Sequence, residues 1–197
     1  MLFDLFGKSK TTETLNAIEM LKEDHARVNE LFAVFKELED SDSPEIVDVV
    51  TTACLELMVH SKLEQEIFYP AVHKVADKKM SDLLAEAEIE HGTIDSLIEK
   101  LATQRLDMEL YKANFKVVQE YVEHHVKEEE NEMFPKIESL DLNLETLGKK
   151  MQSRQMELVE EIAGDPNIAT VLTGSPGAPA PKGQQTGVDV GRFEGPI

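Results

Sequence analysis

The chain has 197 residues, a length that suits one domain with a substantial hydrophobic core. Its net charge of −19 argues against nucleic acid as a partner, because phosphate binding needs a basic surface, and its single cysteine excludes an internal disulfide. No apolar run reaches the roughly 20 residues of a membrane span, and no signal peptide is recognisable. We therefore expect a cytoplasmic protein.

The first predicted helix runs from about residue 14 to residue 39, where apolar residues repeat with the helical period. The second begins at Ser43 and Pro44, since a serine cap before a proline is typical of a first helical turn. We expect Pro70 to end or kink this helix, because proline lacks a main-chain donor and clashes with the preceding turn. Cys54 lies beside the apolar stripe and is predicted to be a small buried residue.

The third predicted helix covers about residues 77–104 and the fourth about residues 107–134, which Pro135 interrupts as Pro70 interrupts the second. A fifth helix, over about residues 144–163, is expected to pack against the open side of the other four. From residue 164 the chain is rich in Pro, Gly and Ala and loses its apolar period, which predicts a disordered tail.

The predicted organisation is therefore an arm, a helical domain and a tail. The arm comprises residues 1–13, the domain residues 14–163 and the Pro- and Gly-rich tail residues 164–197. The end of the tail regains some hydrophobicity, and a docking segment for a protein partner is an alternative to a plain extension.

One sequence phrase occurs twice, 65 residues apart. Each copy has a histidine, a glutamate four residues later and a proline ten residues after the histidine. A lone histidine precedes each copy by 34 or 35 residues. The first set is His25, His60, Glu64 and Pro70, and the second is His91, His125, Glu129 and Pro135.

This doubled pattern predicts a metal site. The spacing of four places each glutamate on the same helix face as its histidine, on an apolar stripe where an unneutralised carboxylate is costly. A single histidine on such a stripe is more often a hydrogen-bonded core residue, but four histidines with two glutamates at matching offsets favour a cation. Imidazole and carboxylate suit iron, manganese, zinc or copper. The predicted ligands are His25, His60, Glu64, His91, His125 and Glu129.

The two remaining histidines are predicted to lie on the surface. His73 follows Pro70 and has no helical partner. His124 points about 100° away from His125, although it also has a glutamate, Glu128, four residues later. The apolar stripe through Val122 favours His125 and Glu129, and not His124 and Glu128, as the pair that faces the core.

These residues resemble the hemerythrin-like (HHE cation-binding) domain over about residues 14–140. The likeness rests on His25 in its Lys-Glu-Asp-His phrase, on the two His-x-x-x-Glu phrases with a trailing aromatic-Pro, and on His91. It implies an all-α, up-down four-helix bundle with a non-haem di-iron centre and hence two iron ions as cofactors. By the same analogy the four histidines bind terminally, while Glu64 and Glu129 bridge the irons. A ferritin-like bundle is rejected, because it needs two Glu-x-x-His motifs.

The chain departs from the oxygen-carrying hemerythrins, which have a fifth histidine on the third helix. Here Ala87 and Asp95 flank His91 at four residues on either side. Asp95 is predicted either to fill the vacant ligand position or to hydrogen-bond to His91. Glu56 and Tyr121, one turn before the two motifs, are candidates for lining the site or orienting a ligand, with simple packing as the alternative for Tyr121.

Two classes of function are compatible with such a centre. The first is a reactive di-iron protein that interacts with O₂, peroxide or NO in detoxification or a redox response, with oxidoreductase or peroxidase-like activity. The missing fifth histidine favours turnover over reversible oxygen carriage. The second is a non-catalytic iron or oxygen sensor or iron-binding module, in which the tail or fifth helix signals to a partner. Iron donation in iron–sulfur cluster repair is a third alternative, although relatives with that role typically carry an additional Cys-containing domain.

Overall fold

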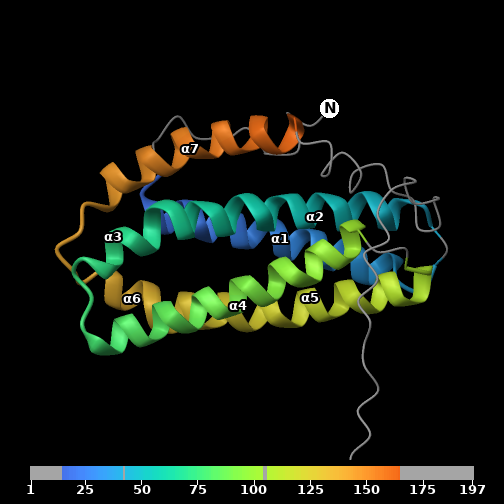
Figure 1. Ribbon diagram of the computed structural model, residues 1–197, viewed down its shortest axis with the longest axis horizontal. Coiled ribbons are helices and arrows are strands. Elements are labelled where there is room, and N and C mark those ends of the chain that lie inside the picture. Colours follow the sequence, from blue (N-terminus) through green and yellow to red (C-terminus); the bar gives the residue numbers. More distant parts are fainter. Residues whose placement is uncertain (1–14, 42, 104–105, 165–197) are drawn as a thin grey trace, which may run out of the picture.

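The computed structural model describes residues 15–41, 43–103 and 106–164, and all of its regular elements there are helical. Four long helices run up and down, and a fifth lies outside them (Figure 1). The predicted all-α fold, a four-helix bundle with an additional C-terminal helix, is therefore confirmed. The predicted arm and the tail beyond Gly164 lie outside the described residues. The long helices are α1 (Ala17–Leu38), α2 (Glu45–Leu63), α4 (Lys78–Thr103), α5 (Met108–Glu128) and α7 (Leu144–Gly164).

Short polar side chains mark where the helices begin. Asn16 and Glu19 form a reciprocal capping box at the start of α1, with each side chain accepting from the other's main-chain N–H. Asp107 accepts from Leu110 N–H at the start of α5, and Ser43 accepts from Glu45 N–H at the start of α2. These caps satisfy N–H groups that have no partner within the helix.

The predicted interruptions at Pro70 and Pro135 take the form of widened turns. The second helix does not end at Pro70 but continues through η2 (Glu64–Phe68) into α3 (Tyr69–His73). The fourth helix likewise continues through η3 (Glu129–Met133) into α6 (Phe134–Ile137). In both, a main-chain N–H bonds to a carbonyl five residues back, from Tyr69 to Glu64 and from Phe134 to Glu129.

A wider turn has a physical reason at these positions. Proline has no N–H to donate, and its ring clashes with the carbonyl four residues earlier, so a regular α-helical turn is unfavourable there. The π-helical turns lie just before Pro70 and Pro135, and the axis changes direction between α2 and α3 (Figure 1). Both turns start at a predicted ligand, Glu64 or Glu129, consistent with the frequent occurrence of π-turns at functional sites.

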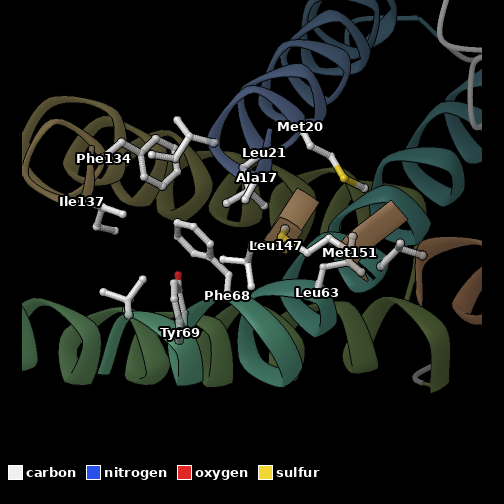
Figure 2. Close-up of a cluster of buried hydrophobic side chains, with 14 of the residues drawn as sticks. Ala17, Met20, Leu21, Leu63, Phe68, Tyr69, Phe134, Ile137, Leu147 and Met151 are labelled. Carbon is white, nitrogen blue, oxygen red and sulfur yellow. The ribbon is translucent and has the colours of Figure 1, made fainter. Parts of the chain in front are cut away.

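Two apolar clusters fill the bundle, one on each side of the layer that holds the predicted ligands. The first, which we call the proline-end cluster, joins α7 to the π-helical segments, and Figure 2 shows Phe68 and Phe134 within it. Their rings meet edge to face, with centroids 5.9 Å apart. The second, the loop-end cluster, includes Phe32, Phe35, Cys54, Leu57, Ile94, Phe115 and Val122.

Cys54 is buried in the loop-end cluster, as predicted, with 1% of its surface exposed. Burial disfavours the thiolate and raises the pKa of Cys54 to about 12. The thiol therefore stays protonated at physiological pH. It serves as a small apolar core residue.

The fifth helix, α7, packs against α1 and α2 and so covers the open side of the bundle, as expected. Its Leu147 and Met151 lie beside Leu63 in the proline-end cluster (Figure 2). Gly148 faces the start of α1 so closely that an added Cβ would lie 2.4 Å from the carbonyl oxygen of Leu15. Among the described helices, none is both long and apolar enough to cross a bilayer.

Replacing Gly148 with alanine should loosen α7 from the bundle. The new methyl group would meet main-chain atoms, which cannot rotate away, so we expect Gly148→Ala to lower the free energy of unfolding by about 1–3 kcal/mol. Gly92→Ala is the matched control, because a Cβ there has nothing within 4 Å and alanine is favoured in a helix by about 0.5–1 kcal/mol. Urea unfolding in the same metal state measures both. Equal stability of the two variants would contradict the close approach of α7.

Candidate metal centre

The fold brings all six predicted ligands together in one buried layer. His25 comes from α1, His60 from α2, His91 from α4 and His125 from α5, while each glutamate begins a π-helical segment. The layer lies between the two apolar clusters and is shielded from water. The exposed fractions are 3% for His25, 4% for His60, 0% for Glu64, 1% for His91, 3% for His125 and 1% for Glu129.

Each glutamate contacts one histidine from each half of the chain. Glu64 Oε2 lies 3.2 Å from the Nε2 atoms of both His60 and His91. Glu129 Oε2 lies 3.2 Å from His25 Nε2 and 3.5 Å from His125 Nε2. The histidines therefore form two pairs, one from α1 and α2 and one from α4 and α5, and both carboxylates reach both pairs.

The donor atoms at the centre of this layer lack hydrogen-bond partners. Among the described residues, the buried side-chain atoms without a partner are His25 Nε2, His60 Nε2, Glu64 Oε1, Glu64 Oε2 and Glu129 Oε2. Unpaired buried polar atoms are rare in folded proteins and costly. All five belong to the predicted ligand set, so their lone pairs are available to a cation. The residues present fit a metal centre of imidazole nitrogen and carboxylate oxygen.

In the absence of a metal, the imidazoles and carboxylates stabilise one another's charges. Burial raises the pKa of Glu64, but neighbouring His60 and His91 outweigh it and hold that pKa well below its ordinary value. Burial lowers the pKa of His60, but the carboxylates of Glu64 and Asp24 outweigh it and raise that pKa well above the ordinary value. The raised pKa of His60 favours its protonated form, which provides positive charge beside the buried carboxylate of Glu64.

The outer nitrogen of every histidine in the layer has its own polar partner. His25 Nδ1 lies 2.8 Å from Glu130 Oε1, and His125 Nδ1 lies 2.8 Å from Glu90 Oε2. The other two pairs are longer, His60 Nδ1 to Asp24 Oδ2 at 3.5 Å and His91 Nδ1 to the Gln65 amide at 3.3 Å. A partner at Nδ1 fixes the ring and turns Nε2 inward, as is usual for metal-binding histidines. The Nε2 atoms of His91 and His125 lie 3.0 Å apart there.

These partners follow the same repeat as the ligands. Asp24 and Glu90 each directly precede a lone histidine and contact the other histidine of their own half. Gln65 and Glu130 each directly follow a glutamate of the layer and contact the lone histidine of the opposite half. Sequence reasoning missed all four. The matching positions of these four partners in the two halves of the sequence were a visible signal. Only the fold shows which histidine each partner contacts.

Aromatic rings at equivalent repeat positions lie against the lone histidines. Tyr69 stacks on His91 with centroids 5.6 Å apart, and Phe134 stacks on His25 at 5.9 Å. Only Tyr69 has a hydroxyl, and it donates to Glu129 Oε1 at 2.9 Å. Burial and the nearby carboxylates of Glu129 and Glu64 raise the pKa of Tyr69 well above its ordinary value, so the phenol remains a donor.

Other residues singled out in the sequence take different positions. His73 and His124 are exposed, as predicted. Tyr121 has 42% of its surface exposed and does not line the layer. Asp95 is exposed, and Gln65 rather than Asp95 meets the outer nitrogen of His91.

Glu56 is buried and lies beside the layer. Its Oε2 atom is 3.4 Å from the guanidinium of Arg27, which also contacts Asp24, the partner of His60. Glu56 thus contacts His60 only indirectly, through Arg27 and Asp24.

A small cavity adjoins the four histidines on the side of the loop-end cluster. Its volume is about 10 Å³, close to what one water molecule requires. The lining combines the four imidazoles, Asp24 and Ser61 with apolar side chains. A molecule of two or three atoms is therefore the largest that this space suits without rearrangement. The apolar lining residues are Val28, Leu57, Ile94, Val122 and Val126.

Comparisons with known proteins identify the family and the fold. The model of the hemerythrin HHE cation-binding domain family matches residues 16–137, more than half of the chain. A hemerythrin HHE cation-binding domain-containing protein from Mycobacterium kansasii has a similar fold, with a TM-score of 0.64 and 24% sequence identity. The match covers 81% of this chain and 98% of that one. Comparison with curated protein sequences gave no match. The chain belongs to the hemerythrin HHE cation-binding domain family.

Proposed function

We propose that the protein binds two iron ions in the buried layer and that this centre interacts with O₂, peroxide or NO, in detoxification or a redox response. The observation that carries the proposal is the convergence of five buried nitrogen and oxygen atoms that make no hydrogen bond, all from the six predicted ligands. Iron accepts imidazole and carboxylate together, and the layer offers both without any thiolate. The proposed ligands are His25, His60, Glu64, His91, His125 and Glu129.

Two positions for ions follow from how the side chains group. His25 and His60 form one pair and His91 and His125 the other, and Glu64 and Glu129 each contact both pairs. A carboxylate that contacts both pairs is placed to be shared by two ions. The Nδ1 partners hold each ring with Nε2 directed inward.

The surroundings of the layer favour a small ligand. Iron bound there would supply the electrons with which O₂, peroxide or NO reacts. The cavity beside the histidines is small, which suits such a molecule better than a larger substrate. Tyr69 holds Glu129 through one carboxylate oxygen and leaves the other directed at the histidines.

Removing both shared carboxylates should abolish loading with two ions. We expect Glu64→Ala combined with Glu129→Ala to lose binuclear metal, because no other carboxylate among the described residues joins the buried ligand groups. His73→Ala is the control and should keep full loading, since this exposed residue belongs to neither group. Metal analysis of protein from iron-fed cells measures the content, and circular dichroism verifies the fold. Two irons in the double variant would contradict the ligand assignment. A single zinc ion in the parent protein would contradict the proposal that the metal is iron.

A reactive centre should respond to small ligands. We expect the anaerobic, reduced, iron-loaded protein to change its optical spectrum on addition of O₂, peroxide or NO, because the small cavity lies directly beside the four histidines. The Glu64→Ala, Glu129→Ala variant, treated in the same way, should show no change. An unchanged spectrum of the parent protein with all three ligands would rule out this function.

One contact favours a sensing role as the second candidate. Arg154 of α7 lies 2.7 Å from Glu66, inside the π-helical segment that begins at Glu64. The same guanidinium contacts Glu157 and Glu161 of its own helix. Metal that binds only the folded state stabilises it. Any change that metal causes in this π-helical segment would reach α7 through the contact between Arg154 and Glu66.

For the sensing role, hydrogen exchange of α7 amides should be slower in metal-loaded than in apo protein. Arg154→Ala should retain metal but make α7 exchange insensitive to it, because the contact with Glu66 is lost. Lys78→Ala is the control, since it removes an exposed ion pair with Asp82 that touches neither α7 nor the layer. Equal exchange in the apo and loaded parent protein would exclude the sensing role.

A further inference from the structure

A second cluster of metal-binding side chain types lies at the surface, beside the second half of the buried layer. Glu90 comes from α4, and His124 and Glu128 come from α5. His124 Nε2 lies 3.5 Å from Glu90 Oε1 and 3.6 Å from Glu128 Oε1. The exposed side-chain fractions are 13% for Glu90, 30% for Glu128 and 59% for His124, so the cluster is open to solvent on one side.

The repeat shows that this cluster lacks a counterpart of the arginine that the first half possesses. Asp24 and Glu90 occupy equivalent positions, each supporting a histidine of the layer. Asp24 is neutralised by Arg27, which also contacts Glu56. Glu90 instead meets two imidazoles, those of His124 and His125. Within the described ranges no lysine or arginine pairs with Glu90 or Glu128.

The spacing of the three donors suits a single ion. For bonds of about 2.0–2.2 Å from a tetrahedral ion to nitrogen and oxygen, neighbouring ligand atoms lie about 3.3–3.6 Å apart. The two measured separations, 3.5 Å and 3.6 Å, agree with that spacing. All three donor atoms lie within 4.8 Å of one another. The i,i+4 relation of His124 and Glu128 fixes two of the ligands on one helix face.

We propose that Glu90, His124 and Glu128 bind one divalent transition-metal ion at the surface, separate from the buried centre. One imidazole with two carboxylates suits Zn²⁺, Co²⁺, Mn²⁺ or Fe²⁺, whereas Ca²⁺ and Mg²⁺ take oxygen ligands. Glu90 keeps its other oxygen, Oε2, at 2.8 Å from His125 Nδ1, so the ion binds without removing the support of that histidine. The ion provides in the second half the positive charge that Arg27 provides in the first.

Cobalt titration of the full-length, metal-loaded protein tests this site. Calorimetry should detect one equivalent of Co²⁺ beyond the metal already present, while elemental analysis shows the original metal retained. His124→Ala and Glu128→Gln should each weaken this binding at least tenfold, because each removes one of three ligands. His73→Ala, which removes an exposed histidine outside the cluster, should bind Co²⁺ like the parent protein.

Several outcomes would overturn the proposal. Absence of the additional equivalent, or equal affinity of the parent protein and His124→Ala, would show that the cluster does not bind the ion. Release of the original metal in proportion to the cobalt taken up would assign the binding to the buried layer instead. The count is made relative to the metal already present, so it does not depend on whether the buried centre holds iron. His124 is exposed and Glu128 half-exposed, so we expect both variants to keep the fold, and matched melting temperatures verify this.

Discussion

The structure depends on the burial of two carboxylates inside an apolar bundle. Glu64 and Glu129 are 0% and 1% exposed, and an ion taken from water into a protein interior costs several kcal/mol even after relaxation. No lysine or arginine among the described residues contacts either one. The imidazole of His60, whose pKa is raised, supplies positive charge beside Glu64, and a cation bound in the layer would supply it to both carboxylates. The rest of the layer, from the Nδ1 partners to the stacked aromatic rings, is arranged around that requirement.

The bundle buries a carboxylate twice, each time with the same local backbone structure. A proline ten residues after a histidine is accompanied by a π-helical turn, and that turn starts at the glutamate. The two halves then support one another, because Gln65 and Glu130 each contact a histidine of the opposite half. Neither half forms this layer alone, so the layer depends on the packing of the two helical hairpins against each other.

The halves are equivalent in backbone and different in side chains. His91 meets a neutral amide where His25 meets a carboxylate, and a carboxylate partner makes an imidazole the stronger ligand. Tyr69 donates to Glu129, whereas its counterpart Phe134 has no hydroxyl to donate to Glu64. The two histidine pairs therefore have chemically different surroundings.

Sequence alone determined the helical class, the approximate ends of five helices and the six residues that gather in the layer. It could do so because helical periodicity and the His-x-x-x-Glu spacing are local, and burying a glutamate on an apolar stripe has few explanations. The tertiary structure alone decided that Glu64 reaches His91, that Glu56 acts through Arg27 and that Tyr121 faces solvent. It also decided how the prolines are accommodated, by wider turns within continuous helices. These features depend on how distant helices pack and rotate against one another, and the spacing within a single helix carries no information about that.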